Sequence, residues 1–257
     1  MDLPIVHYKM NDNAATSTVV DAQVGHDGAA RTDAGEINTD TINATGKING
    51  ALRFNGSSQY VKVSDHADFN ITTTLSVCIW AQNDNAAIAT AEDFCSKYNQ
   101  FGDDREWFLF IDTNEKVNGI ISVDGTFTNV SHVVSDAAVT DTTVWHFYAF
   151  TFDASGGAVS PILYLDGSVV ASTEIGTARA SINNGTSPIV IASHYTNAGT
   201  PTTSGHWDGL IDNVMIFDRA LTPSEITELW NNGNGTEEFG GGRPRGRYDG
   251  TYRSRYN

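Results

Sequence analysis

The 257-residue chain is poor in several features that mark common protein classes. It has two cysteines, too few for a disulfide framework or for a zinc site built from cysteine ligands. It has no run of about 18 apolar residues, which argues against a transmembrane helix and membrane insertion. Basic residues are also scarce: 15 lysines and arginines face 31 aspartates and glutamates, and the formal net charge is -16. A body this acidic repels nucleic acid, which is therefore not an expected partner.

The two cysteines, Cys78 and Cys95, leave two alternatives open. A disulfide between them is feasible if their strands are neighbours, and it would contribute about 3 kcal/mol. Otherwise both are buried thiols that pack as small apolar residues.

The N-terminal residues 1–7 contain neither the basic segment nor the apolar core of a signal peptide. Two explanations are open. Either a secreted protein has lost its leader, or the protein is made in a cytosol and released in a particle, as phage structural proteins are. The expected location is a virion or another extracellular surface.

Short runs rich in β-branched and aromatic residues recur along the chain, separated by Gly, Asn, Asp and Ser. This spacing predicts an all-β sandwich with strands near residues 5–10, 51–54, 60–63, 75–82, 107–112, 117–123, 145–152, 162–165, 189–192 and 213–217. Both faces of the run at 145–150 are apolar, which predicts a central strand whose outer face is also covered. Asp166 and Gly167 lie between two of these runs and predict a type I′ hairpin turn.

One short helix is predicted near the C-terminus. Thr222 is an expected N-cap, Pro223 follows at the first helical position, and Glu225 completes a capping box. An apolar stripe of Ile226, Leu229 and Trp230 follows, and Gly233 is the expected stop. We expect this helix to plug one end of the sandwich.

Composition divides the chain into a domain at residues 1–239 and a tail at 240–257. The tail is rich in Gly, Arg and Tyr and has no core-forming periodicity, which predicts a flexible basic tail, disordered unless a partner binds it. Because the rest of the chain is acidic, the tail is a candidate assembly arm toward another copy or another structural protein. An ordinary disordered terminus is the alternative. The candidate contact residues are Arg243, Arg245, Arg247, Tyr248, Tyr252, Arg253, Arg255 and Tyr256.

Three stretches resemble one known family. They are NGALRFNGSSQYV at 49–61, LSVCIW at 75–80 and GLIDNVMIFDRALTPSEI at 209–226. Together they resemble the laminin-G-like domains of the concanavalin A-like group, and a phage-encoded member is one interpretation. The resemblance implies a two-sheet antiparallel jelly-roll sandwich. It does not imply one function, because such folds carry adhesion, sugar-binding, enzymatic and structural roles.

The resemblance also implies a site for one structural Ca²⁺, since such domains often hold an ion where the first and last strands meet. Asp21, in an early loop, and Asp212, in the closing strand, are the candidate ligands. The loop departs from the family pattern, because Ala22, Gln23 and Val24 replace the usual Ser-Gly-Asn. The alternative is that Asp21 forms a turn and Asp212 pairs with a local donor.

A sugar-binding face needs an aromatic platform next to polar groups. The candidates are Trp107, His194, Tyr195 and Trp207, each close to polar loop residues. Burial in the core is the alternative for each of them.

No acidic run with glycosidase spacing, no nucleophile elbow and no paired cysteine nucleophile are present, so the chain is expected not to be an enzyme. We therefore predict a non-catalytic structural, decorating or attachment protein of a virion or other surface assembly. The alternative is a carbohydrate-binding, lectin-like adhesion module. A polysaccharide-active enzyme is the least favoured interpretation, because it needs a second acid facing Asp212 or Glu106.

Overall fold

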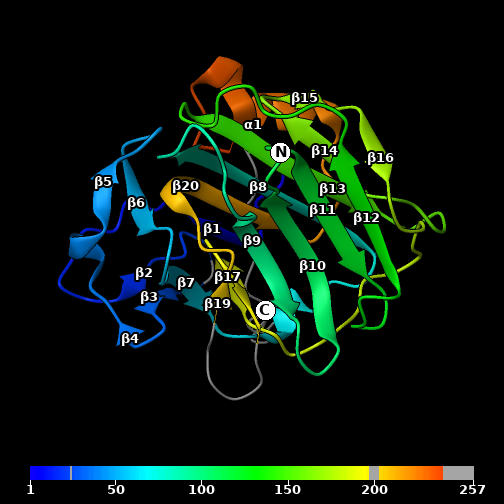
Figure 1. Ribbon diagram of the computed structural model, residues 1–257, viewed down its shortest axis with the longest axis horizontal. Coiled ribbons are helices and arrows are strands. Elements are labelled where there is room, and N and C mark those ends of the chain that lie inside the picture. The colour runs from blue at the N-terminus through cyan, green and yellow to red at the C-terminus, as the bar shows by residue number, and fades with distance from the viewer. Residues whose placement is uncertain (24, 197–202, 240–257) are drawn as a thin grey trace, which may run out of the picture.

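The computed structural model describes residues 1–23, 25–196 and 203–239. The chain forms two large β-sheets packed face to face, with one short α-helix against the outside of one sheet (Figure 1). Neighbouring strands are antiparallel apart from one short parallel contact between β18 and β9. This is the all-β jelly-roll sandwich that the sequence predicts.

The first sheet has eight strands within the described residues, in the order β15-β14-β13-β8-β20-β6-β5, and β1 pairs with β20. Their bounds are β1 Val6–Tyr8, β5 Asn43–Thr45, β6 Gly50–Asn55, β8 Thr74–Asn83, β13 His146–Asp153, β14 Ile162–Leu165, β15 Ser168–Val169 and β20 Asp208–Phe217. We call it the eight-stranded sheet.

The second sheet has twelve strands within the same ranges, in the order β16-β12-β11-β10-β9-β17-β7-β3-β2, with β4, β18 and β19 at its margins. Their bounds are β2 Thr18–Val19, β3 Gly28–Thr32, β4 Gly35–Glu36, β7 Gln59–Val63, β9 Glu92–Asn99, β10 Asp104–Ile111, β11 Val117–Ser122, β12 Val130–Ser135, β16 Ser172–Glu174, β17 Ile189–Ile191, β18 His194–Tyr195 and β19 Thr203–Ser204. Three 3₁₀ turns complete the elements, η1 Thr39–Thr41, η2 Ala67–Phe69 and η3 Asn231–Gly233.

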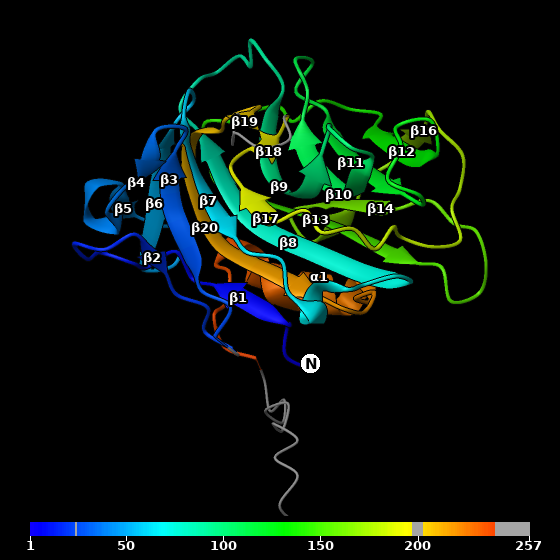
Figure 2. The same cartoon turned by 90° about the horizontal axis from the view of Figure 1, so that it is seen from below.

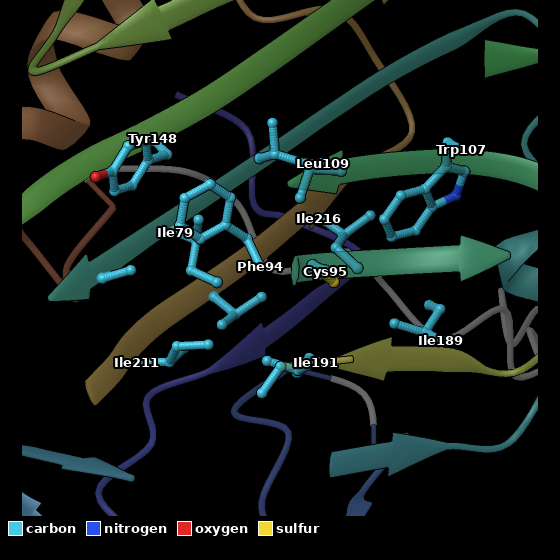
Figure 3. Close-up of a cluster of buried hydrophobic side chains, with 14 of the residues drawn as sticks. Ile79, Phe94, Cys95, Trp107, Leu109, Tyr148, Ile189, Ile191, Ile211 and Ile216 are labelled. Carbon is cyan, nitrogen blue, oxygen red and sulfur yellow. The ribbon is translucent and has the colours of Figure 1, made fainter. Parts of the chain in front are cut away.

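The main core lies between the sheets, where the alternating apolar residues of facing strands meet (Figure 3). Phe94 of β9 stacks on Tyr148 of β13 with ring centroids 4.3 Å apart, so the two sheets contact each other directly. Each large apolar side chain removed from water contributes about 1.5–3 kcal/mol. This core is large enough to stabilise the sandwich without a covalent crosslink.

All ten predicted strand runs fall on strands. The predicted hairpin turn is confirmed as well, because Asp166 and Gly167 both have positive φ, 49° and 75°, between β14 and β15. Strands β9 and β12 were not predicted. Both mix apolar residues with buried polar ones without a regular alternation, and Glu92, Asp93 and Lys97 give β9 the composition of a loop.

Helix α1, Pro223–Trp230, begins with the predicted capping box of Thr222 and Glu225. It ends at Asn231, which adopts the left-handed conformation, two residues before the expected stop. The helix does not plug an end of the sandwich. Ile226 and Leu229 instead pack on the outer face of the eight-stranded sheet, a layer that lies below β8 and β20 in Figure 2. No helix in the described ranges is long and apolar enough to span a bilayer.

This outer layer explains why β13 is apolar on both faces. Phe147 and Ala149 point into the layer beneath the helix, whereas Tyr148 and Phe150 point into the main core. A jelly-roll strand normally shows one wet face, so a doubly apolar strand indicates a covered sheet. The predicted covering of this strand is therefore confirmed.

The two cysteines are free and buried, so the alternative of two thiols holds. Cys78 lies on β8 and faces the helix layer, whereas Cys95 lies on β9 of the other sheet and faces the main core. They cannot form a bridge because Cys78 points away from the core between the sheets, into which Cys95 points. Burial raises the pKa of both thiols.

Candidate functional site

A cleft of about 450 Å³ opens on the outer face of the twelve-stranded sheet. Strands β9 and β10 form its floor, and β18, β19 and the turns after β3 and β6 form its sides. Its lining residues are Asp33, Gly56, Ser57, Thr90, Ala91, Asp93, Phe108, Phe110, His194, Thr203, Ser204, Gly205 and His206. The lining combines aromatic rings with carboxylates, imidazoles and hydroxyls.

Two phenylalanines of β10 form the apolar floor. Phe108 and Phe110 point outward because they alternate with Leu109, which points into the main core. Their rings stack with centroids 4.6 Å apart and an interplanar angle of 29°. Phe108 is 6% exposed, whereas Phe110 is only partly buried. The pair is a flat apolar surface inside a polar cleft.

A buried carboxylate–imidazole pair stands beside this floor. Nδ1 of His194 lies 2.5 Å from Oδ2 of Asp93, and the Phe108 ring centroid lies 5.1 Å from that of His194. Burial raises the pKa of Asp93 to about 6, and His194 opposes that rise, so the carboxylate is ionised at pH 7. Asp93 therefore fixes the imidazole with Nδ1 as the donor. Within the described residues, Nε2 of His194 has no hydrogen-bond partner.

Gly205 lets the wall of the cleft approach Asp93. A Cβ at this position would lie 2.3 Å from Oδ2 of Asp93, and the residue has a φ of +66°. The carbonyl of Gly205 accepts a hydrogen bond from the backbone N–H of Asp93. Only glycine allows this contact.

The rim of the cleft carries a second cluster of polar side chains. The hydroxyl of Thr203 donates to Oδ1 of Asp33 at 2.7 Å and lies 3.1 Å from Nε2 of His206. Burial lowers the pKa of His206, which favours its neutral form at pH 7. The cleft therefore presents hydroxyl, carboxylate and neutral imidazole groups around an aromatic floor.

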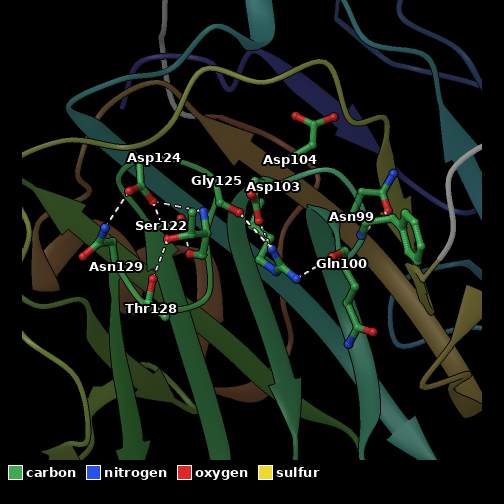
Figure 4. Close-up of polar contacts among 12 residues, drawn as sticks. Asn99, Gln100, Asp103, Asp104, Ser122, Asp124, Gly125, Thr128 and Asn129 are labelled. Carbon is green, nitrogen blue, oxygen red and sulfur yellow. Dashed lines mark hydrogen bonds and ion pairs between the residues drawn. The ribbon is translucent and has the colours of Figure 1, made fainter.

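An arginine holds the turns at one end of the floor strands. Arg105 donates to the carbonyls of Gln100 and Gly125, at 2.5 Å and 3.0 Å, and so connects the β9–β10 turn to the β11–β12 turn (Figure 4). Its Nε also donates to the hydroxyl of Tyr98 at 3.2 Å. Tyr98 packs on Phe108 and on the edge of His194. The arginine thus supports the floor from below without lining the cleft.

A second hollow of about 340 Å³ lies on the same sheet around β12 and the segment after β16. It is lined by Phe127, Thr128, Val130, His132, Ile175, Gly176, Thr177 and Arg179. Its described lining residues include no carboxylate, and Phe127 is 55% exposed.

Of the four predicted ligand-contacting residues, the structure places only His194 in the cleft. Trp107 and Trp207 are 1% and 0% exposed and belong to the main core, so their prediction as ligand contacts is wrong. Trp207 packs on Phe94 with centroids 4.8 Å apart. Tyr195 is buried against Tyr60 and does not line the cleft. An indole enclosed by both sheets cannot stack on a ligand.

The cleft residues that the sequence analysis missed are Asp93, Phe108, Phe110 and the rim residues. The signal was present for the phenylalanines, because Phe108 and Phe110 alternate with core residues in the run at 107–112. For Asp93 the sequence holds no signal, because a carboxylate is not expected inside a strand.

The two predicted calcium ligands have different surroundings. The Asp21 carboxylate accepts backbone N–H groups, among them those of His7 at 2.9 Å and Gln23 at 3.0 Å. Asp212 lies on β20 and accepts the N–H of Ile48 at 2.7 Å. Burial raises the pKa of Asp212 to about 8, and its Oδ1 has no partner in the described part of the chain. Calcium binding at these residues stays a prediction.

The eight tail residues predicted to mediate assembly, between Arg243 and Tyr256, lie outside the described residues.

Comparisons with known proteins agree with this architecture. A family model described as the concanavalin A-like lectin/glucanases superfamily, of laminin G type, matches residues 55–227. Comparison with curated proteins gave no match.

Among solved structures, the chain is similar to domain 4 of AbnA, a GH43 extracellular arabinanase from Geobacillus stearothermophilus, in complex with arabinotriose. The TM-score is 0.61 at 19% identity, covering 88% of this chain and 97% of that one. It is also similar to the binding domain of botulinum neurotoxin serotype D/C, with a TM-score of 0.60 at 13% identity over 89% of this chain and 51% of that one. A sialidase from Trypanosoma rangeli gives 0.59 at 15% identity, covering 91% and 34%.

Identities this low establish the fold and not the ligand. The family match is different in kind, because it spans more than half of the chain and includes most of the strands of both sheets. The chain therefore belongs to the laminin-G-like family of the concanavalin A-like lectin/glucanases superfamily.

Proposed function

We propose that this protein is a non-catalytic carbohydrate-binding module whose binding site is the cleft over β9 and β10. The observation that carries the proposal is the buried pair of Asp93 and His194 beside the stacked Phe108 and Phe110. A buried carboxylate is costly for folding, and a few polar groups placed beside an aromatic surface are typical of a binding site.

A sugar ring suits this cleft because one of its faces is made of C–H groups and its edge carries hydroxyls. Its C–H face would lie on Phe110 and Phe108. One hydroxyl would hydrogen-bond to Nε2 of His194, which is otherwise unpaired in the described part of the chain. Others would reach Asp33 and the hydroxyls of the rim. Nε2 of His194 would then gain the partner that it lacks in the described part of the chain.

The similar structures support a glycan as the ligand class. One of them is an arabinanase domain in complex with arabinotriose, and another is a sialidase with an inhibitor. The toxin domains show that the same fold also serves protein partners, since one is in complex with synaptotagmin II. The polar, aromatic-floored cleft favours the glycan for this chain.

The non-catalytic part of the proposal rests on where the acids lie. Glu106 is fully buried and pairs with Lys97, and Asp212 is buried beneath the loop that contains Ile48. Neither lines the cleft. Within the cleft, Asp93 is held by His194 and Asp33 by Thr203. Incubation with a bound oligosaccharide is therefore expected to release no shorter product, and product release would overturn this part.

Binding can be measured by screening the full chain against an oligosaccharide array that includes arabinotriose, followed by calorimetry on the glycans that bind. Phe110→Ala and His194→Gln are each expected to weaken binding by at least tenfold, about 1.4 kcal/mol, because they remove the platform and the hydroxyl partner. Phe127→Ala, the matched change in the second hollow, is expected to leave binding unchanged.

Two results would contradict the proposal. If no glycan binds, the module is not lectin-like. If Phe127→Ala abolishes binding and the two cleft variants do not, the second hollow is the site.

We also propose that the protein attaches to a surface assembly, for example that of a virion. It rests on composition, since residues 240–257 hold five arginines and the rest of the chain is strongly acidic. Light scattering of the full chain, with and without calcium, is expected to show a defined oligomer. Replacing Arg243, Arg245, Arg247, Arg253 and Arg255 by serine is expected to dissociate it. A full chain that stays monomeric would contradict the assembly role.

A further inference from the structure

Two histidines and an aspartate meet on a loop surface that shares no residue with the cleft. They are His26, which precedes β3, and His66 and Asp68, which follow β7. Strands β3 and β7 pair antiparallel with Ala29 opposite Lys62. The residue three positions before Ala29 therefore emerges next to the residues just beyond β7. The sheet register, not proximity in sequence, brings the three side chains together.

The donor atoms of the three side chains converge. One imidazole nitrogen from each histidine and one oxygen of Asp68 all lie within 4.8 Å of one another. Nε2 of His26 lies 2.8 Å from Oδ2 of Asp68, and Nδ1 of His66 lies 3.5 Å from the same oxygen. The two imidazole centroids are 4.3 Å apart. Both rings thus point at one carboxylate instead of spreading into solvent.

The backbone beneath this cluster is held in place. The carbonyl of His26 accepts a hydrogen bond from the Tyr8 hydroxyl at 2.6 Å, and its N–H donates to Asp21 at 3.2 Å. His66 caps the 3₁₀ turn η2, and its Nδ1 accepts the N–H of Asp68 at 3.2 Å. Phe69, 1% exposed, lies behind both rings. A rigid base limits the rearrangement that a bound ligand would require.

The cluster is also reachable from solvent. The side chain of His26 is 13% exposed, and those of His66 and Asp68 are 51% and 53% exposed. An ion that binds two nitrogens and one oxygen at about 2.0–2.2 Å needs these atoms roughly 3.3 Å apart. The exposed side chains of His66 and Asp68 are free of core packing and can rotate toward that geometry.

We propose that His26, His66 and Asp68 bind a divalent transition-metal ion, with Zn²⁺ as the expected occupant. Two imidazole nitrogens and one carboxylate oxygen are ligands that Zn²⁺ accepts, and Ca²⁺ prefers oxygen alone. The His66 nitrogen that accepts the N–H of Asp68 carries no proton, and an ion that binds there would replace this hydrogen bond on its lone pair. Three protein ligands leave a fourth position for water or for a donor from a partner.

The test is calorimetric titration of Zn²⁺ into the full chain prepared without a polyhistidine tag. Visible absorption of the Co²⁺ form then reports on nitrogen ligation. Saturable one-to-one binding is expected, with a rise in melting temperature because the unfolded chain does not hold the three ligands together. His66→Ala and Asp68→Asn are each expected to weaken binding by at least about tenfold. Both residues are exposed, so the variants are expected to fold, and circular dichroism checks this.

His146→Gln is the matched control. His146 also lies 2.7 Å from a carboxylate, that of Asp166, but within the described residues no second imidazole joins this pair. This variant is expected to bind Zn²⁺ as the wild type does. Absence of one-to-one binding in the wild type would overturn the proposal, as would binding that His66→Ala and Asp68→Asn leave unchanged. Binding lost in His146→Gln would place the site elsewhere.

Discussion

Replacing Lys97 by methionine is expected to destabilise the protein by roughly 3 kcal/mol, because it leaves a buried carboxylate without its partner. Lys97 and Glu106 are both fully buried, and the Lys97 ammonium donates to Oε1 of Glu106. The ammonium also lies 3.0 Å from Asp65, which is 29% exposed. Urea unfolding at pH 7 measures the loss as a lower midpoint with an unchanged slope.

The double variant Lys97→Met/Glu106→Leu is expected to recover most of this loss. Two apolar side chains of similar size need no charge partner, and replacing a whole buried ion pair is often neutral or stabilising. Arg31→Met is the surface control: Arg31 and Glu36 lie 3.1 Å apart and Glu36 is 56% exposed, so a loss below about 1 kcal/mol is expected. A double variant as unstable as Lys97→Met would show that lost packing, not the orphaned charge, is the cause.

Raising the pH from 6 to 9 is expected to destabilise the wild type by roughly 3 kcal/mol more than Asp212→Asn. Burial raises the pKa of Asp212 from 3.8 to about 8. Up to about pH 8 the folded state therefore keeps a proton that the unfolded chain has already released. This stabilising contribution is lost as the pH rises through 8. In the presence of a chelator, the fall in melting temperature between pH 6 and pH 9 is expected to be about 6–12 °C larger for the wild type than for Asp212→Asn.

Other buried carboxyls also lower the stability of the protein as the pH rises. The comparison with Asp212→Asn isolates the contribution of Asp212. Burial also raises the pKa of Glu92 and Glu106 to about 7, and both the wild type and Asp212→Asn keep these two groups. Asp40→Asn, at an exposed position, is expected to follow the wild type. Equal pH dependence in the wild type and Asp212→Asn would contradict the assignment.

The same curves test the predicted calcium site. If Ca²⁺ binds at Asp212, the ion holds the carboxylate ionised and removes the cost of burying that charge. Adding Ca²⁺ at pH 9 is then expected to raise the melting temperature of the wild type and not that of Asp212→Asn. No effect of Ca²⁺ on the wild type would contradict the prediction.

Local features of the sequence predicted most of the fold. The β-branched and aromatic runs located ten strands, the pair Asp166 and Gly167 located a hairpin turn, and the Thr222 capping box located the helix. These signals are readable because each arises from contacts within a few residues. The sequence also indicated the covered outer face of β13, because a strand with apolar residues on both faces is disfavoured unless both faces are buried.

The sequence did not locate the candidate site. Trp107 and Trp207 were predicted to contact ligand and are instead in the core, whereas Phe108 and Phe110, which lie in the predicted strand at 107–112, form the floor of the cleft. Alternation along β10 places Trp107 on one face and Phe108 and Phe110 on the other. Only the position of the opposing sheet decides which of these faces is buried.

Long-range pairing decided the remaining features. Strand β9 carries Asp93 to the cleft and Lys97 to the interior, and its charges are tolerated because His194 and Glu106 arrive from segments 101 and 9 residues away. His26 meets Asp68 across 42 residues through the register of β3 and β7. A buried or clustered charge is stabilised by partners that tertiary structure supplies, so its role is not encoded in its immediate neighbours.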